Sequence, residues 1–600
     1  MTTKSNKEIR QYTSEAYRLT FLEDRPFVRL HSPQGEPLAD LFIPSSVHSL
    51  EGRDDTTRLG ELEVDEQPGV TTFVLHAQSS LWKSKRYHFR CFPHRFTYHV
   101  EIEGEGQLAE VDYFGGYFSA QPRWGSGFFW SGQHFLSGFN PEPNADEMNY
   151  FSSQSHVHID LMGVPLPGWK DWFFTPVPFC FAMQLPQGWL ALGVEAQPGQ
   201  YRWTEYAYHG KLEAFHLSLA YDGQTAVSGS YQLPAIGFDF ASDEYAALQR
   251  HVAEVSLHQP ESVQDARRQR PTPAWWQTPI FCGWGAQFHL AVAQGGRASE
   301  YARQDVYVQF LQALETAQVD PGIVVLDDKW QLGYGENYVD ESKWPDLPGF
   351  ISQQHARGRK VLLWLKAWDT EGLPTEECIT NAAGLPLACD PSSPAYERRL
   401  RASVQRMIST VGYDADGFKI DFTARIPCGP GLNIQGDTWG LELMRRYLSI
   451  LHSEAKRIKP DALIMAHTPH PYLGDVVDMI RLNDLNPDKA INPAMIHRAR
   501  VASIACPRVI IDTDNWQMPD KAAWRAYTSL QPELGVPSLY YATHVDATGE
   551  AFDAEDYRLI RESWALFREK GKLAMSGGAE LHRNEEAGGV PIHPFLPAEG

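Results

Sequence analysis

The sequence predicts a multidomain protein in which an N-terminal antiparallel β-sandwich precedes a (β/α)₈ TIM barrel. The chain has 600 residues, which is longer than a single domain with one hydrophobic core usually is. Its first part reads as short strands between turns, whereas its second part alternates apolar runs with helical segments. We expect a sandwich over residues 1–257, a linker over 258–278, the barrel over 279–570 and a C-terminal tail or short extension over 571–600.

Residues from about 15 to 255 carry the sandwich prediction. The runs 27–31, 71–76 and 96–102 alternate in polarity or are rich in β-branched and aromatic residues, as strands are. Turn-forming stretches such as Glu-Gly-Glu-Gly and Tyr-Asp-Gly-Gln separate such runs. No long stretch in this part shows helical periodicity to the eye, so an antiparallel sandwich is expected.

A polar, proline-bearing segment from His258 onwards is the predicted linker, and the pattern changes after it. Eight apolar runs of strand length follow, at 280–284, 322–328, 360–366, 417–422, 462–467, 479–484, 508–512 and 537–542. Apolar residues recur at helical spacing between them, as in 306–317 and 396–410, and 556–569 would supply a closing helix. Continuous apolar strands alternating with helices indicate a parallel sheet buried on both faces, and eight repeats match a barrel.

The composition limits the classes of binding partner that we expect for this protein. A net charge of −22 argues against nucleic acid and against anionic membranes, because both attract basic surfaces. The seven cysteines are scattered, without a close Cys-x-x-Cys pair, so neither a zinc knuckle nor a disulfide framework is predicted. The first ten residues lack the apolar run of a secretion signal, and a cytoplasmic protein is the expectation. A homo-oligomer remains open.

Acidic residues follow four of the predicted barrel strands. They are Asp327 with Asp328, Asp421, Asp484, and Asp512 with Asp514. A single acid after a strand is often only a helix N-cap, but four such ends on the face where barrels hold their active sites favour a functional site. Tryptophans lie among these acids, at Trp284, Trp330, Trp364, Trp368 and Trp516. Carboxylates that bind hydroxyls and indoles that cover apolar ring faces are typical of a sugar pocket.

Glycoside cleavage requires two carboxyl groups with opposed pKa values, one ionised and one protonated. Asp421 suits the ionised role, because Lys419 precedes it by two positions in the strand and points to the same side. Asp484, two strands later, suits the protonated role. The sequence therefore predicts Asp421 as nucleophile and Asp484 as acid/base.

A metal site is the competing use of such residues. Asp512-Thr-Asp514 resembles a pair of ligands for a hard cation, and His467-Thr-Pro-His470 offers two imidazoles. No third ligand stands at motif spacing, and the intervening proline disfavours a helical presentation. We therefore expect neither a catalytic metal nor a cofactor. A metal-dependent lyase or aldolase is the alternative that loss of activity with a chelator would reveal.

The strand ends resemble glycoside hydrolase clan D, and within it family 36, which contains α-galactosidases and raffinose synthases. Phe281-Cys-Gly-Trp284 is similar to the family's first-strand motif, and Asp327-Asp328-Lys-Trp330 to its Asp-Asp-Gly-Trp signature. Asp416-Gly-Phe-Lys-Ile-Asp421 resembles the nucleophile strand, and Arg481-Leu-Asn-Asp484 resembles the acid/base motif. Two departures are Lys329 in place of glycine and Trp364-Leu-Lys366 in place of Trp-Phe-Glu. The resemblance covers residues 280 to 545.

The resemblance implies a retaining α-glycosidase, α-galactosidase-like, that releases a terminal α-linked hexose from an oligosaccharide or glycoside through a glycosyl–Asp421 intermediate. The residues expected to bind the substrate are Asp327, Asp328, Trp330, Lys419, Arg481, Trp284, Trp364, Lys366, His467, Asp514 and Trp516. The alternatives are an α-glycosyltransferring enzyme of the raffinose-synthase type and a non-catalytic sugar-binding relative. The sugar, the linkage and the choice between hydrolysis and transfer stay open.

Overall fold

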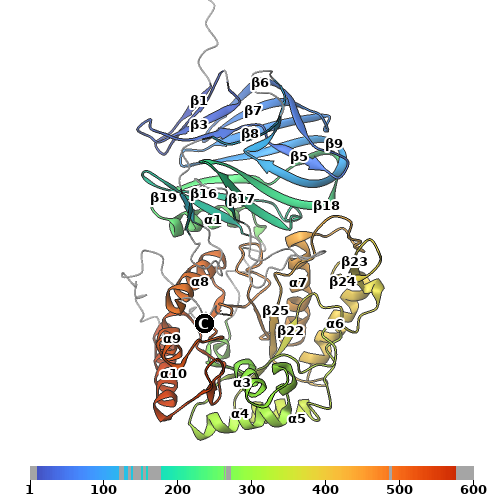
Figure 1. Cartoon of the computed structure of the whole chain (residues 1–600), viewed down its shortest axis with the longest axis vertical. Coiled ribbons are helices and arrows are strands. Elements are labelled where there is room, and N and C mark those ends of the chain that lie inside the picture. Colours follow the sequence, from blue (N-terminus) through green and yellow to red (C-terminus); the bar gives the residue numbers. More distant parts are fainter. Residues whose placement is uncertain are drawn as a thin grey trace, which may run out of the picture.

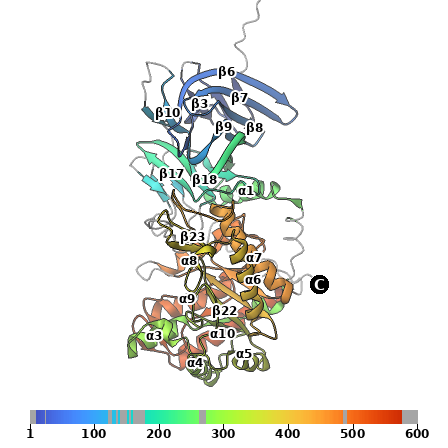
Figure 2. The same cartoon turned by 90° about the vertical axis from the view of Figure 1, so that its right-hand side faces the viewer.

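The computed structural model describes residues 10–23, 25–120, 127–132, 137–139, 150–152, 157–159, 178–261, 264, 272–484 and 490–575. Most of the predicted C-terminal tail and part of the predicted linker lie outside these residues. Figures 1 and 2 show β-sheets stacked above a barrel of strands and helices, so the molecule has at least two parts. None of the described helices is long and apolar enough to cross a membrane.

The N-terminal part contains one large curled sheet and a smaller one. The four-stranded sheet consists of β1 (Gln11–Thr13), β2 (Arg18–Phe21), β3 (Phe27–His31) and β4 (Pro37–Phe42). The fifteen-stranded sheet consists of β5 (Ser46–Ser49), β6 (Asp55–Gln67), β7 (Val70–Ser79), β8 (Ser84–Cys91), β9 (Arg95–Tyr113), β10 (Gly115–Phe118), β11 (Gly127–Trp130), β12 (Ser137–Phe139), β13 (Tyr150–Ser152), β14 (Val157–Ile159), β15 (Cys180–Leu185), β16 (Gly188–Glu195), β17 (Glu205–Lys211), β18 (Ala214–Gln232) and β19 (Ala235–Ala241). The predicted strands at 27–31, 71–76 and 96–102 are confirmed as β3, part of β7 and part of β9.

The expectation that this part lacks a helix is wrong. Helix α1 (Glu244–Leu257) begins after Asp243, whose carboxylate accepts a hydrogen bond from the backbone N–H of Ala246 at 2.8 Å. Its buried residues recur at helical spacing, and they include Tyr245, Leu248, Val252 and Val255. The helix packs on β15, β16 and β19 and also contacts helix α8 of the barrel (Figures 1 and 2).

Eight parallel strands form a nearly closed barrel, as the sequence predicts. They are β20 (Ile280–Cys282), β21 (Ile323–Leu326), β22 (Lys360–Lys366), β25 (Gly417–Asp421), β26 (Leu463–Ala466), β27 (Met479–Arg481), β28 (Ile510–Asp512) and β29 (Ser538–Leu539). Sequential strands are neighbours from β20 through β28, and β29 returns to pair with β20. Backbone hydrogen bonds from Val536 to Ile511 and from Thr513 to Val536, of 2.8 and 3.1 Å, join the remaining edges. The strand interiors are buried because apolar side chains cover both faces.

Helices surround these strands. They are α3 (Trp284–Gln294), α4 (Gln304–Thr316), α5 (Leu347–Ala356), α6 (Pro394–Ile408), α7 (Gly440–Ile458), α8 (Ile491–Ala505), α9 (Lys521–Leu534) and α10 (Ala554–Met575). The helices predicted at 306–317, 396–410 and 556–569 are confirmed as α4, α6 and part of α10. Short elements complete the barrel part: the 3₁₀ helices Ala274–Gln277, Ala298–Tyr301 and Thr375–Glu377, and the strand pairs β23 (Cys378–Thr380) with β24 (Pro386–Cys389) and β30 (His544–Val545) with β31 (Glu550–Ala551).

The two parts meet through aromatic stacking and hydrogen bonds. The rings of Tyr201, before β17, and Tyr472, after β26, stack with centroids 3.8 Å apart. Glu442 of α7 accepts hydrogen bonds from the Tyr472 hydroxyl at 2.7 Å and from the Gly199 backbone N–H at 2.6 Å. A Cβ on Gly440, whose φ is +61°, would lie 2.3 Å from the Trp203 carbonyl oxygen, so only glycine permits this approach.

Candidate active site

The carboxyl ends of the barrel strands bring the predicted acids to one face. Asp421 is the last residue of β25, and its register partner on β22 is Lys366. Arg481 ends β27, and Asp512 ends β28 as its register partner. Because parallel strands end at the same edge of a barrel, side chains from four different strands converge there.

Arg481 connects the two predicted catalytic carboxylates. Its Nη2 lies 2.9 Å from Oδ1 of Asp421, and its Nη1 lies 2.8 Å from Oδ1 of Asp484. Nη1 also donates to Asp514, whose side chain is fully buried. The Asp421 and Asp484 side chains keep exposed fractions of 13% and 22%, so both remain accessible from solvent. The guanidinium of Arg481 therefore binds the carboxyl groups of both Asp421 and Asp484.

The surroundings of Asp421 and Asp484 push their pKa values in opposite directions. Burial would raise the pKa of Asp421, but Arg481, His467 and Lys419 together hold it well below its usual range. Burial raises the pKa of Asp484 to about 7, reinforced by the negative charges of Asp514 and Asp421 and opposed by Arg481. Near neutral pH, Asp421 is ionised and Asp484 is partly protonated, which is the division of roles that an acid/base pair requires.

Lys419 forms a buried cluster with the last residue of β20 and the residue directly after β21. Its Nζ donates to Oδ2 of Asp327 at 2.7 Å and lies 3.4 Å from Sγ of Cys282. The Cys282 thiol donates to the same oxygen of Asp327 at 2.9 Å. Charge on Asp327 raises the pKa of Lys419 although burial opposes this, so Lys419 stays cationic beside Asp421.

A second polar cluster surrounds Asp328. Its Oδ1 accepts a hydrogen bond of 2.8 Å from the hydroxyl of Tyr334, and burial raises the Asp328 pKa to about 6. The Nζ atoms of Lys329 and Lys366 lie 4.1 and 4.4 Å from the centroid of the Tyr334 ring. Each lysine also pairs with an acid, Lys329 with Glu371 at 2.6 Å and Lys366 with Asp369 at 2.7 Å.

The predicted tryptophans take different positions. The indole of Trp364 donates to Oδ2 of Asp421 at 3.2 Å and so lies at the candidate nucleophile. Trp516 and Trp284, both partly exposed, have ring centroids 5.8 Å apart, and the Trp516 indole donates to Asp546 at 2.7 Å. Trp330 has no exposed surface, and its indole donates to the Trp364 carbonyl oxygen at 2.8 Å, so it supports that strand from within the core.

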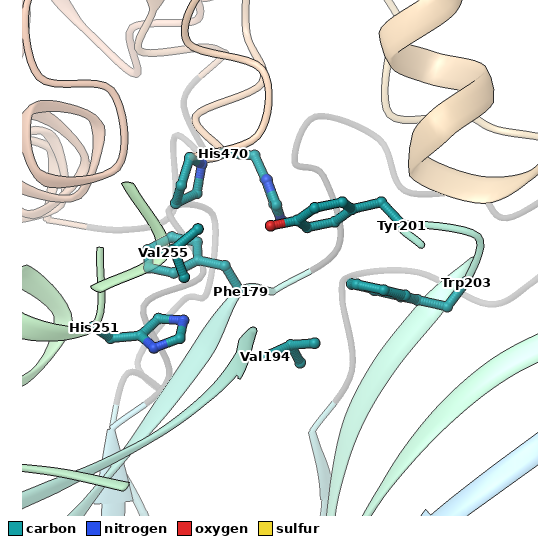
Figure 3. Close-up of a pocket in the computed structure, with 8 residues that line it drawn as sticks. Phe179, Val194, Tyr201, Trp203, His251, Val255 and His470 are labelled. Atoms are coloured by element: carbon teal, nitrogen blue, oxygen red, sulfur yellow. The ribbon is translucent and has the colours of Figure 1, made fainter. Parts of the chain in front are cut away.

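The two histidines of the 467–470 segment diverge. Nε2 of His467 lies 3.4 Å from Oδ1 of Asp421, on the barrel face. His470 instead lies at the junction with the N-terminal sheet, where it lines a small cavity with Tyr201, Trp203, Phe179 and His251 (Figure 3). Asp512 and Asp514 are already bound by protein donors, Ser538 to Asp512 and Arg481 to Asp514. The two histidines are therefore directed to different parts of the molecule, and the two acids are held by these protein donors.

Three non-glycine residues beside these acids have left-handed backbone conformations. Phe422, directly after Asp421, has φ = 60°; Asn483, directly before Asp484, has φ = 79°; and Asp514 itself has φ = 50°. A left-handed backbone conformation costs free energy at a residue other than glycine. Residues in such conformations cluster at functional sites. The strained positions therefore coincide with the ends of β25, β27 and β28 that carry the acids.

Sequence reasoning missed Cys282, Tyr334 and Tyr540 as neighbours of this site. Lys419 Nζ lies 5.0 Å from the centroid of the buried Tyr540 ring. Tyr540 and Cys282 each lie within or directly after a predicted barrel strand, so their place at a strand end was available as a signal. Tyr334 lies in the loop after β21, where no pattern in the sequence marks it.

Several solved structures share this fold at low sequence identity. A GH31 family sulfoquinovosidase from E. rectale in complex with an aza-sugar inhibitor is similar with a TM-score of 0.56 and 11% identity, over 94% of this chain and 83% of that one. An α-galactosidase from Thermus thermophilus in complex with stachyose gives a TM-score of 0.50 and 13% identity, over 84% and 99%. A cycloalternan-forming enzyme from Listeria monocytogenes gives 0.51 and 11%, over 96% and 56%. No family model matches the chain, and no curated protein matches it.

Proposed function

We propose that the chain is a retaining α-glycosidase, α-galactosidase-like, that releases a terminal α-linked hexose from an oligosaccharide or glycoside. The observation that carries this proposal is the pair of Asp421 and Asp484, held by one arginine and driven to opposed pKa values. Retaining enzymes need their two carboxyl groups about 5–5.5 Å apart, closer than inverting enzymes do. Two carboxyl oxygens bound by one guanidinium are compatible with this spacing, and NMR of the first-formed sugar tests it.

The reaction proceeds in two displacements. An oxygen of Asp421 attacks the anomeric carbon while Asp484 gives its proton to the glycosidic oxygen, which leaves as an alcohol. The ionised Asp484 then takes a proton from water, whose oxygen attacks the anomeric carbon and expels Asp421. Asp327, Asp328 and Lys419 are suited to bind the hydroxyl groups of the sugar, and the indoles of Trp364, Trp284 and Trp516 to cover its apolar faces.

The remaining assignments belong to the same proposal. Arg481, Lys366, His467, Asp514 and Trp330 complete or support the sugar site. The sheets of residues 1–257 form the sandwich, 258–278 the linker and 279–570 the catalytic barrel of a family 36-like enzyme in the cytoplasm. Three proteins of similar fold are described as a sulfoquinovosidase, an α-galactosidase and a cycloalternan-forming enzyme. Their descriptions support an enzyme that acts on sugars.

The proposal is tested with a panel of aryl α-glycosides and NMR of the first-formed sugar. Release of the α-anomer from one α-glycoside, with Asp421→Ala inactive, is the expected result. A β-anomer as first product would contradict retention, and no turnover of any α-glycoside combined with tight sugar binding would favour a non-catalytic relative. Addition of a sugar acceptor distinguishes hydrolysis from transfer, because a transferring enzyme yields a new glycoside in place of the free sugar.

A further inference from the structure

A second cluster of ionisable side chains is buried in the N-terminal part, outside the barrel. It joins Arg95 of β9, Glu195 of β16, Asp239 of β19 and His251 of α1, with His258 at the end of that helix. The exposed fractions of the Glu195, Asp239 and His251 side chains are 4%, 4% and 0%. Burying charges at this depth costs free energy unless each finds a partner, so the cluster requires an explanation.

Two glycines make room for it. Gly193 and Gly237 are directly opposed in the antiparallel pair of β16 and β19, so their absent side chains would point to the same side. A Cβ on Gly193 would lie 2.3 Å from Nδ1 of His251, and one on Gly237 would lie 2.2 Å from Oε1 of Glu195. The sheet thus forms a cradle that any larger residue would fill.

The arginine occupies one side of the carboxylates. Arg95 donates to Oε1 of Glu195 and, at 2.5 Å, to Oδ1 of Asp239, with a longer contact of 3.3 Å to Oδ2. Oε2 of Glu195 lies 4.0 Å from His258 Nδ1, and Oδ2 of Asp239, which also accepts the longer arginine contact, lies 3.7 Å from His251 Nδ1. An outer donor that fixes the far oxygen of a carboxylate is a common support for a metal ligand.

Among the described residues, the His251 ring makes a long polar contact of 3.7 Å from its Nδ1 to Oδ2 of Asp239. Neither of its ring nitrogens has a hydrogen bond there, although the side chain is fully buried, and the same holds for Nδ1 of His258. The ligand atoms of Glu195, Asp239 and His251 all lie within 4.8 Å of one another. Tetrahedral zinc with bonds of about 2.0–2.1 Å needs ligand atoms about 3.4 Å apart, so the 3.7 Å between Asp239 and His251 requires only a small closure.

The net charge of the cluster also favours a bound cation. Glu254 also pairs with Arg95, at 3.4 Å, so three carboxylates surround one guanidinium and leave two negative charges. A divalent cation would neutralise this excess, and two carboxylates with two imidazoles form a ligand set that suits zinc.

We propose that Glu195, Asp239 and His251, with His258 as fourth ligand, bind one divalent transition-metal ion of the zinc type. The ion is structural, since the four side chains come from the sheet, from α1 and from the residue directly after α1, and none comes from the barrel face. It would fix α1 to the sheet at the junction with the barrel, where His251 also lines the cavity that His470 borders (Figure 3).

The test uses the full-length chain, stripped with a chelator and titrated with Zn²⁺ alone. We expect one equivalent to bind and to raise Tm, and His258→Gln and His251→Gln to weaken the association at least about tenfold. His76→Gln is the matched control, because it removes an imidazole 3.1 Å from Glu63 in the same sheet and should leave zinc binding unchanged. If His251→Gln does not fold, His258→Gln decides, since His258 is partly exposed.

Two results would overturn the proposal. One is a wild-type chain that binds no zinc equivalent near neutral pH. The other is zinc bound as tightly by His258→Gln as by the wild type, which would place the ion elsewhere. Glycoside turnover does not enter this test, so failure of the proposed function would leave its outcome untouched.

Discussion

Arg481 places its Nη2 atom 2.9 Å from the Oδ1 atom of Asp421, at the ends of two barrel strands that have β26 between them. The same guanidinium reaches Asp484 and Asp514. Its positive charge lowers the pKa of Asp421 and opposes the rise in the pKa of Asp484, so the difference between these two carboxyl groups depends on this one side chain.

We expect Arg481→Gln to lower kcat/KM by about 10²-fold or more, because a preorganised donor at the site is lost. The pKa of Asp421 should rise, since Arg481 is the largest influence that lowers it, and an acidic limb should then enter the pH profile of kcat/KM.

The free energy of unfolding of Arg481→Gln should fall by about 3–5 kcal/mol, because Asp514 is left buried without its cation. Arg399→Gln, which breaks an ion pair with Glu377 away from the site, is the control for the pH profile. An unshifted pH profile in Arg481→Gln would contradict this assignment.

Asp421→Ala should reduce turnover of aryl α-glycosides by about 10⁴-fold or more, because no covalent intermediate can form. Initial rates with a nitrophenyl α-glycoside measure the effect. Asp437→Asn, whose side chain is 95% exposed, should match the wild type. Undiminished turnover in Asp421→Ala would remove the residue from the nucleophile role.

Asp484→Ala should affect substrates according to their leaving groups. Alkyl glycosides need a proton on the departing oxygen and should lose about 10²–10⁴-fold, whereas fluoride or nitrophenyl leaving groups need little protonation. The first displacement, measured as the burst of leaving group, should therefore be spared for the activated substrates. An equal loss across all leaving groups would indicate a positioning role in place of proton transfer.

The pH dependence follows from the two carboxyl groups. Activity needs Asp421 ionised and Asp484 protonated, so kcat/KM should fall as the pH rises through about 7, where Asp484 loses its proton. On the acidic side the rate should hold down to low pH, since the Asp421 pKa lies well below its usual range. Rates from pH 4 to 9 test the sign, and a rate that increases steadily above pH 7 would contradict the acid role of Asp484.

Tyr472→Ala should lower Tm, because it removes the stack with Tyr201 and the hydrogen bond to Glu442. A buried aromatic truncation costs about 3–5 kcal/mol, whereas Tyr472→Phe keeps the ring and should cost only about 1 kcal/mol. Thermal unfolding of both variants separates the two contributions. Equal effects of Ala and Phe would mean that the stack contributes little to the junction.

The barrel could be predicted because each strand is a continuous apolar run, a pattern that burial on both faces imposes. The location of Asp421 and Asp484 at one face could be predicted because acids at strand ends share one face of such a barrel, whereas their catalytic roles stay predictions. The contact between Cys282 and Asp327 could not, since 45 positions separate them and no local pattern marks the pairing. Helix α1 was missed although Asp243 and the spacing of Tyr245, Leu248 and Val252 are helix signals, because strand-like runs dominate the surrounding sequence.

The short loop that holds both His467 and Tyr472 bears on how this chain can be engineered. One end of the loop lies beside the candidate nucleophile Asp421, and the other end stacks on the ring of Tyr201 from the N-terminal part. A barrel excised as a minimal catalyst would keep the reactive groups but lose the support of this loop. The N-terminal half therefore supports the loop that carries His467. Exchanging this half between homologues should alter turnover as well as folding yield.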